Sequence, residues 1–263
     1  MEIAIVIAAG FLCGFFTTLA GSGTAITLPL LIFLGLSPAV ASGTNRLTVV
    51  VATLAASITF IRAGLINWAL AFKMITPTVL GCILGTLFID VIPPKVLEWI
   101  IVGSVVIALI LILTSVKQML ESVHNDAPRF RFQDAFYLFL IGVWMGLVFL
   151  EGATFLLIVL ILALRLQLAI ANAYKSIIIF SAVTISFFIL DYTGDINWRL
   201  SILLAIGGIV GGYIGAKFSM HESAKKWTYR VLVVIILVEL AHLVVFIYKG
   251  QAMSVNNMLM PMM

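Results

Sequence analysis

Long apolar runs make up almost the whole chain and constrain its fold more than any other feature. Ten can be counted, at about residues 3–20, 24–36, 40–61, 69–91, 96–116, 135–149, 153–166, 169–190, 199–217 and 228–248. Only 10% of the 263 residues are charged, whereas a soluble domain carries about 25%. The runs are continuous, unlike the alternating segments of about 10 residues that a membrane β-barrel requires. We therefore expect an all-α, multi-pass protein of the cell (inner or plasma) membrane, in contact with the lipid bilayer.

The remaining composition argues against several other classes of protein. The net charge is +4, but no basic cluster with interleaved aromatic residues occurs, so we expect no nucleic-acid binding. Cys13 and Cys82 lie in separate apolar runs, and the three histidines are far apart. Neither pattern has metal-ligand spacing, so we expect no metal and no cofactor. A homo-oligomer remains open.

One polar interval, residues 117–134, divides the apolar runs into two groups of five. We interpret residues 1–116 as membrane repeat 1, 117–134 as a cytoplasmic linker, 135–249 as membrane repeat 2 and 250–263 as a disordered tail. Such a midpoint linker is typical of membrane proteins built from an internal duplication.

Residues recur between the two groups at a nearly constant spacing. The tripeptide Ile-Asn-Trp occurs at 66–68 and again at 196–198. Further matches pair Gly81 with Gly211 and Gly85 with Gly215 at a spacing of 130, and Gly14 with Gly142, Leu36 with Leu164 and Ala41 with Ala169 at 128. The paired glycines have the small-xxx-small spacing that lets membrane helices approach closely. Together these matches predict a duplication.

The distribution of lysine and arginine predicts how the two repeats are oriented. Basic residues gather in the linker 117–134 and in the loop 217–230, which places both on the cytoplasmic side. Five crossings per repeat then give the two repeats opposite orientations. We therefore expect two inverted repeats, each of about five hydrophobic segments.

The start of repeat 1 is the most unusual stretch for a membrane helix. The first apolar run stops at Gly21-Ser22-Gly23, and the next, Ala25 to Leu36, has only about a dozen residues, whereas a spanning helix needs about 20. A third run opens with Ser42-Gly43-Thr44-Asn45-Arg46. Short, broken helices expose backbone groups that are tolerated at membrane depth only beside a cavity or ligand. We expect such helices at the start of each repeat.

On these residues the chain resembles the TauE/SafE sulfite exporter family. The repeats of that family begin with a helix that runs into a glycine-rich break, a short helix with a proline, and a small-Gly-Thr-Asn helix start. Here these features are Gly14, Gly21-Ser22-Gly23, Pro29 and Ala41–Asn45. The resemblance covers most of the chain and implies a membrane transporter of small sulfur-containing anions. Repeat 2 departs from it at Phe149–Gly152 and Ala171–Lys175.

The broken helices and the polar residues beside them predict a substrate site. Exposed N–H groups at a helix start favour an anion, and neutral side chains add donors for sulfonyl oxygens. The predicted substrate-binding residues are Gly21, Ser22, Gly23, Thr24, Thr44, Asn45, Arg46, Asn172 and Lys175. Burying Arg46 or Lys175 in a bilayer costs about 2.5–3.5 kcal/mol, so each needs a partner or ligand. The alternative is a structural charge that reaches the interface or closes a salt bridge.

Glu151 lies in the repeat-2 break and is the proton-coupling candidate, because desolvation favours the neutral form of a carboxyl group. The alternative is a fixed ion pair with Lys175, which would remove Lys175 from substrate binding.

We therefore predict a secondary transporter of sulfite, sulfonates or sulfoacetate that works around a central site between the repeats. An anion channel or a structural membrane subunit is the first alternative. An intramembrane serine protease using Ser22 and His242 is the second and weaker one, because a duplication predicts a two-fold site and not a dyad. The chain is not expected to be an enzyme.

Overall fold

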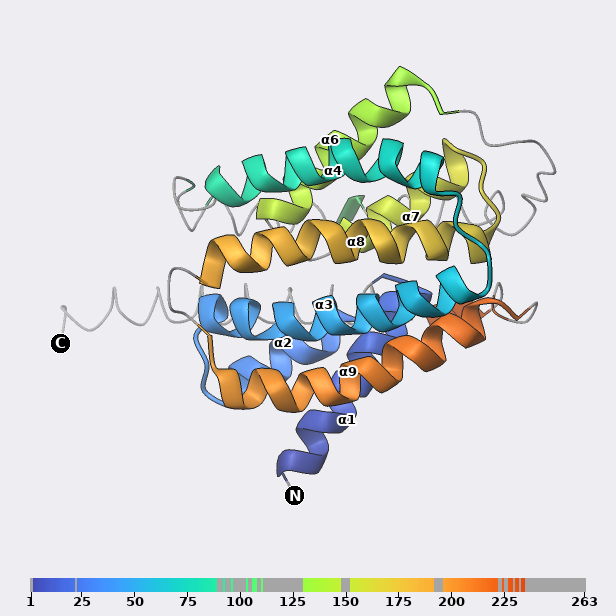
Figure 1. Cartoon of the computed structure of the whole chain (residues 1–263). Helices are drawn as coiled ribbons and strands as arrows, with labels where there is room; N and C mark the ends of the chain where they lie inside the picture. Colours follow the sequence, from blue (N-terminus) through green and yellow to red (C-terminus); the bar gives the residue numbers. More distant parts are fainter. Residues whose placement is uncertain are drawn as a thin grey trace.

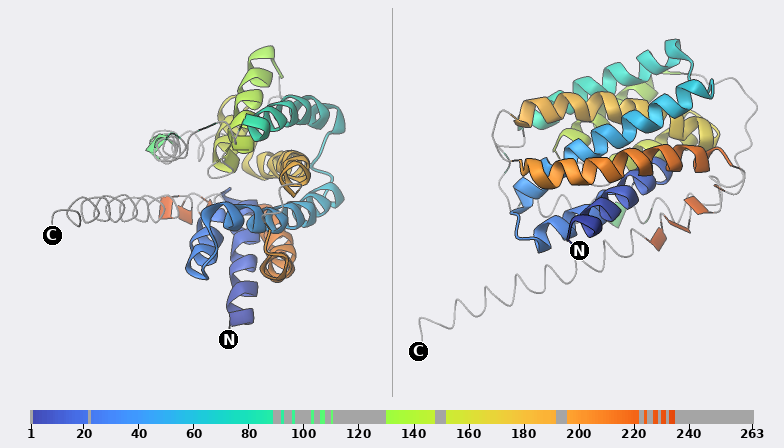
Figure 2. Two further views of the ribbon diagram at one scale, coloured as in Figure 1. Left: turned by 90° about the vertical axis from the view of Figure 1, so that its left-hand side faces the viewer. Right: turned by 60° about the horizontal axis from the view of Figure 1, so that its bottom comes forward.

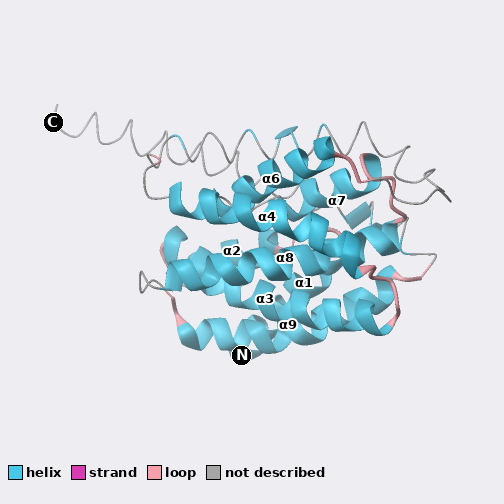
Figure 3. Ribbon diagram, turned by 45° about the horizontal axis from the view of Figure 1, so that its top comes forward, coloured by secondary structure: helices cyan, strands magenta, loops and turns pink. Residues whose placement is uncertain are grey.

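The computed structural model describes residues 2–21, 23–88, 130–147, 152–191 and 196–221, with isolated positions between 92 and 110 and between 224 and 234. This described part is helical and contains no strand (Figure 3). Its helices are α1 (Glu2–Leu19), α2 (Thr24–Phe33), α3 (Pro38–Arg62), α4 (Trp68–Phe88), α6 (Phe132–Leu147), α7 (Gly152–Leu162), α8 (Leu168–Asp191) and α9 (Trp198–Ser219).

These eight helices match eight of the ten predicted apolar segments. The other two segments, 96–116 and 228–248, lie largely outside the described residues, as do most of the linker 117–134 and the whole of the tail 250–263. The all-α prediction is confirmed for the described part of the chain. The predicted domain boundaries stay predictions.

Helix length follows the same order in both halves of the chain. The second helix of each half is short, with 10 residues in α2 and 11 in α7. The third and fourth helices are long and apolar enough to cross a membrane, over Val40–Arg62, Trp68–Phe88, Leu168–Ile189 and Trp198–Ser219. Each half therefore begins with a pair of helices whose second member is short, and continues with two helices long enough to span a membrane.

Local chemistry accounts for where these helices begin and end. Gly21 adopts a positive φ of 109° just after α1, a conformation that glycine reaches without steric cost. The side chain of Asn67 accepts a hydrogen bond from Leu70 N at 3.3 Å at the start of α4. Asn197 accepts one from Leu200 N at 3.1 Å at the start of α9. The two Ile-Asn-Trp sequences are thus matching helix N-caps.

The eight helices form two bundles that each combine both halves of the chain (Figure 2, left). The first bundle contains α1, α2, α3 and α9, and the second contains α4, α6, α7 and α8. The fourth helix of each half packs most extensively against the first helix of the other half: α9 against α1, and α4 against α6. The bundles are therefore exchanged units and not the sequence halves themselves.

Glycine makes this exchange possible at equivalent positions of the two bundles. A Cβ at Gly211 would collide with the carbonyl oxygen of Phe11, and one at Gly81 with that of Phe139. A Cβ at Gly215 would approach Phe15 O to 2.9 Å, and one at Gly85 would collide with Val143 O. The close backbone approach predicted from the paired glycines is confirmed.

The two bundles meet mainly where α3 crosses α8 (Figure 1). Arg46 near the start of α3 contacts Ser186 near the end of α8. Phe60 near the end of α3 clusters with Ala173 near the start of α8. The two helices are therefore antiparallel. We call their contact, with the adjoining ends of α1 and α7, the bundle interface.

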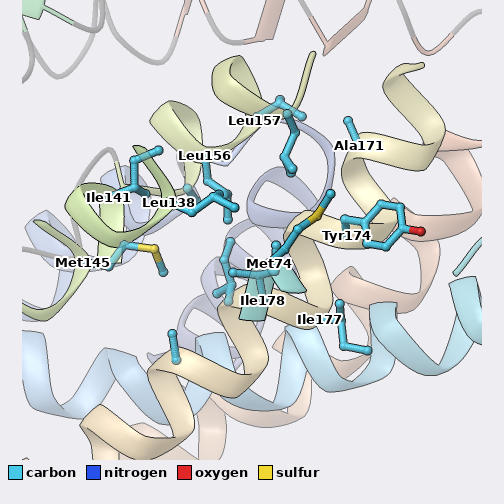
Figure 4. Close-up of a cluster of buried hydrophobic side chains, with 14 of the residues drawn as sticks. Met74, Leu138, Ile141, Met145, Leu156, Leu157, Ala171, Tyr174, Ile177 and Ile178 are labelled. Atoms are coloured by element: carbon cyan, nitrogen blue, oxygen red, sulfur yellow. The ribbon is translucent and has the colours of Figure 1, made fainter. Parts of the chain in front are cut away.

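Each bundle also has its own apolar core. That of the second bundle is the larger, and Figure 4 shows Met74 of α4, Leu138 and Met145 of α6, Leu156 of α7 and Ile178 of α8 packed together. All five side chains are fully buried. This core fixes α8 against α4, α6 and α7, and so fixes the positions from which its polar side chains leave the helix.

The spacing between equivalent residues differs from the prediction in one region. Ala52 O lies against Gly212 as Ala182 O lies against Cys82, so α3 and α8 correspond at a spacing of 130. The expected pairing of Ala41 with Ala169 at 128 is therefore wrong by two residues, and that of Leu36 with Leu164, in the loops before these helices, stays a prediction. The physical reason is that α7 is one residue longer than α2, and the loop that follows it is also one residue longer.

Candidate functional site

Two fully buried cations bridge the bundle interface. Lys175 on α8 has 0% of its surface exposed, and Arg46 on α3 has 3%. Each side chain leaves one bundle and donates a hydrogen bond to the other. Asp134 is the acidic residue whose side chain is described, and its carboxylate accepts a hydrogen bond from Arg131 N at 2.7 Å and forms no ion pair with either cation. Within this part of the chain, the two charges are therefore held by neutral oxygens.

Lys175 reaches the break between α1 and α2. Its Nζ donates to the carbonyl oxygen of Thr18 at 2.9 Å, in the last turn of α1. A cation is favoured there because the carbonyls at a helix C-terminus carry partial negative charge. One of three ammonium donors is used in this bond.

The first residues of α7 pack against the same break. A Cβ at Gly21 would lie 2.8 Å from both Ala153 C and Thr154 N, so the close approach of α7 to the break requires glycine. The broken start of the first half and the start of α7 therefore meet near Lys175. The predicted substrate site between the repeats stays a prediction.

Asn172 lies three residues before Lys175, on the adjoining face of α8. Its side chain is completely buried, and neither its Oδ1 nor its Nδ2 has a hydrogen-bond partner within the described structure. Buried side-chain amides are nearly always hydrogen-bonded, so a completely buried amide without a partner is a candidate ligand contact. Asn172 is thus a donor and an acceptor beside a buried lysine.

Arg46 lies among hydroxyl groups on the second bundle. Its guanidinium donates to Ser186 Oγ, which is also hydrogen-bonded to Thr86 Oγ1 at 2.8 Å. The Nε of Arg46 is buried without a partner among the residues described. The Cys82 thiol, nearby on α4, donates to Ala182 O at 3.5 Å. Sequence reasoning did not single out Thr86 or Ser186, because serine and threonine are common in membrane helices.

Thr44 and Asn45 face the inside of the first bundle. Thr44 Oγ1 accepts a hydrogen bond from Asn197 N at 3.0 Å, and Asn45 Oδ1 accepts one from Thr27 Oγ1 at 2.7 Å. These oxygens therefore have partners within the protein. Their predicted contact with a substrate stays a prediction.

Tyr174 is the counterpart of Thr44 in the second bundle, and the sequence analysis missed this role. Its hydroxyl accepts a hydrogen bond from Asn67 N at 3.0 Å, as Thr44 accepts one from Asn197 N. The signal was available, because Thr44 and Tyr174 have the same spacing of 130 as the two Ile-Asn-Trp sequences.

The remaining predicted residues divide into two groups. Gly23 is the N-cap of α2 and makes no side-chain cap, and Thr24 is buried in the first turn. Ser22, Glu151 and His242 lie outside the described residues. The ion pair between Glu151 and Lys175, proton coupling by Glu151 and the serine protease alternative therefore stay untested.

Spanning helices, broken helices and buried cations between two bundles are the features of a multi-pass membrane transporter. The family model for the sulfite exporter TauE/SafE matches residues 6–243, and the chain belongs to this family. The predicted resemblance and the membrane location are thereby confirmed.

Curated relatives carry the same general description. A probable membrane transporter protein of Haemophilus influenzae is 28% identical over 243 residues, which cover 89% of this chain and 90% of the relative. The probable membrane transporter protein ORF9 of Sinorhizobium sp is 24% identical, with 91% and 90% covered. YfcA of Escherichia coli K12, also a probable membrane transporter protein, is 24% identical, with 81% and 79% covered. No solved structure matches the chain significantly.

Proposed function

We propose that this protein is a secondary transporter of small sulfur-containing anions of the sulfite, sulfonate and sulfoacetate class. The observation that carries the proposal is the pair of buried cations, Arg46 and Lys175, at the bundle interface, which among the described side chains are hydrogen-bonded to neutral oxygens only. An uncompensated cation at membrane depth is costly, and a bound anion would offset that cost.

The neutral groups beside the cations support an oxyanion as the substrate. Asn172 offers a free amide donor beside Lys175, and Arg46 retains an unused Nε donor within the described structure. Sulfite and sulfonates carry several oxygens that accept such hydrogen bonds, and hydrogen bonds to charged groups are the stronger ones.

The exchange of helices supports transport by relative movement around the interface. The antiparallel crossing of α3 and α8 is what two repeats of opposite orientation would produce, so we propose that the repeats are inverted. Movement of one bundle against the other would open the interface alternately to the two sides of the membrane, as in other inverted-repeat transporters.

Proton coupling through Glu151 remains part of the proposal. Glu151 directly precedes α7, whose first residues pack against the break at Gly21. If Glu151 carries the coupling proton, Glu151→Gln abolishes the dependence of transport on a proton gradient. Unchanged gradient dependence in this variant would exclude that role.

Thermal unfolding with a panel of anions tests the function. The panel contains sulfite, sulfate, thiosulfate, methanesulfonate, sulfoacetate, acetate and phosphate, applied to the purified protein and to Arg46→Ala. A ligand at 100 times its Kd adds about 2.7 kcal/mol of stability. We expect selective stabilisation by a sulfur anion in the wild type and a smaller stabilisation in Arg46→Ala, which lacks one of the two buried cations.

The exposed Arg62 at the end of the same helix provides a matched control, because Arg62→Ala removes the same charge away from the interface. Its response to the anions should equal that of the wild type. The proposed function would be contradicted if none of the anions stabilised the wild-type protein and the protein transported none of them across a membrane.

A further inference from the structure

The two cations lie at different levels of the bundle interface. The guanidinium of Arg46 contacts Ser186, which lies eleven residues beyond Lys175 on α8. At a rise of 1.5 Å per residue, those positions on α8 are about 16 Å apart along the helix axis. The ammonium group of Lys175 is directed to Thr18 of α1, which forms no part of the Arg46 cluster. A single sulfite-sized anion is too small to bind both groups at once.

The duplication does not make the two cations equivalent either. At the spacing of 130 that relates α3 to α8, Lys175 corresponds to Asn45 and Arg46 corresponds to Ser176. One residue along an α-helix turns the side chain by about 100°. The two cations therefore leave their helices on different faces and do not form the symmetric pair of one central site.

We infer that the bundle interface contains two separate anion-binding sites that a substrate occupies in succession. The lysine site comprises Lys175 and Asn172 beside the break at Gly21, and the arginine site comprises Arg46, Ser186 and Thr86. This inference rests on the proposed function and specifies how the substrate passes through it.

Each site is nearer to a different side of the membrane. Lys175 is about 10 Å from the start of α8 and Arg46 is about 12 Å from the start of α3, at 1.5 Å per residue. Because α3 and α8 are antiparallel, those two helix starts lie at opposite sides. The orientation expected from the loop charges places the lysine site on the cytoplasmic side.

The donors at the two sites suit the same class of ligand in different ways. Lys175 retains two ammonium donors within the described structure, and the Asn172 amide adds two N–H donors and an acceptor oxygen. Arg46 presents a planar fork that matches two oxygens of one anion. Both sites would hold a small oxyanion, with hydroxyl groups completing the arginine site.

Binding stoichiometry tests the inference. ³⁵S-sulfite would be titrated onto the full-length protein in nanodiscs under anaerobic conditions. We expect two sulfite ions per wild-type chain and one per chain in each of Lys175→Gln and Arg46→Gln. The exposed residues Lys217 and Arg62 supply the controls, and Lys217→Gln and Arg62→Gln should each still bind two.

A conservative variant keeps the test valid if either glutamine variant fails to fold. Arg46→Lys preserves the charge and loses the planar fork, so it should weaken one binding step by about tenfold and leave the other unchanged. Tenfold corresponds to about 1.4 kcal/mol.

One sulfite per wild-type chain, lost in both glutamine variants, would overturn the two-site inference and leave the transporter proposal standing. Loss of both ions in a single variant would also overturn it, because the sites would not be separate. Absence of binding and of flux for every sulfur anion would instead refute the proposed function.

Discussion

The two bundles are built from the same parts, yet they present different polar groups to each other. In both, a glycine-containing fourth helix packs on the first helix of the other half, and an asparagine caps that fourth helix. At the equivalent positions of α3 and α8, however, the first bundle has Asn45 and Arg46, and the second has Lys175 and Ser176. Packing and capping residues therefore match between the two halves of the chain, whereas the polar residues at equivalent positions of α3 and α8 differ.

The largest effects are expected from substitutions at the glycines that contact the facing helix, and they test whether the two bundles are packed equivalently. Gly211→Ala and Gly81→Ala each place a Cβ against a backbone oxygen of the facing helix. We expect each to reduce the free energy of unfolding by about 3 kcal/mol, at the upper end of overpacking costs. Denaturant unfolding in detergent would measure this. Gly103→Ala is the control, because a Cβ there meets nothing within 4 Å. A large effect in only one bundle would show that the two are not packed equivalently.

Lys175→Asn gives α8 the residue that α3 has at the equivalent position, and it tests whether this polar difference between the bundles matters for transport. We expect Lys175→Asn to lower kcat/KM for sulfite at least tenfold, or about 1.4 kcal/mol, because the cation facing the break is lost. Sulfite flux in proteoliposomes is the measurement, with the exposed Lys217→Asn as the matched control. Wild-type flux in Lys175→Asn would assign Lys175 a structural role.

The two hydroxyl groups that accept a hydrogen bond from the backbone N–H of an N-cap residue should contribute equally to stability. Tyr174→Phe leaves Asn67 N without its acceptor, and Thr44→Val does the same to Asn197 N. Each loss should cost about 1 kcal/mol, the typical net value of a hydrogen bond. Thermal unfolding of the two variants and of the double variant would show additive effects. If Thr44→Val instead abolished transport without changing stability, Thr44 would contact the substrate as the sequence predicts.

The loops after the short helices should give the smallest effects, with opposite signs. Gly35 follows α2 with a φ of 92°, and Arg165 follows α7 with a φ of 54°. A residue with a side chain pays about 1–2 kcal/mol in this left-handed region. Gly35→Ala should therefore destabilise by about 1 kcal/mol, and Arg165→Gly should stabilise by less, because glycine also loses more chain entropy on folding. If both variants changed the free energy of unfolding in the same direction, the two loops would not have equivalent conformations.

The sequence predicts the helices well because their signals are local. Apolar run length placed eight helices, Gly21 and Gly23 marked the break, and Asn67 and Asn197 were recognisable as caps. The acceptor of the Lys175 ammonium group was not predictable, since it is a backbone carbonyl that any residue at position 18 would supply. The sequence also did not predict that α4 and α9 each pack in a bundle with the first helix of the other half. Glycine spacing shows that a helix can pack closely, but it does not name the partner.

The separation of Arg46 from Lys175 escaped prediction for a geometric reason. Sequence matches at a spacing of 128 in one region and of 130 in another leave the correspondence between α3 and α8 uncertain by one or two residues. A shift of one residue moves a side chain to another face of its helix. The contacts of Ala52 with Gly212 and of Ala182 with Cys82 fix that register, and so do the equivalent hydrogen bonds of Thr44 and Tyr174.

The packing of α1 against α9 also bears on how the protein is made. α1 leaves the ribosome almost 180 residues before α9 begins, which at about 5–20 residues per second is roughly 10–35 s. During that time the surface of α1 that will face the glycines of α9 has only lipid or other proteins of the membrane to contact. A chain that stops before α9 leaves the first bundle without its fourth helix. Assembly of the first bundle therefore waits for the insertion of α9, and products truncated before α9 are expected to expose the surface of α1 to the proteases and chaperones of the membrane.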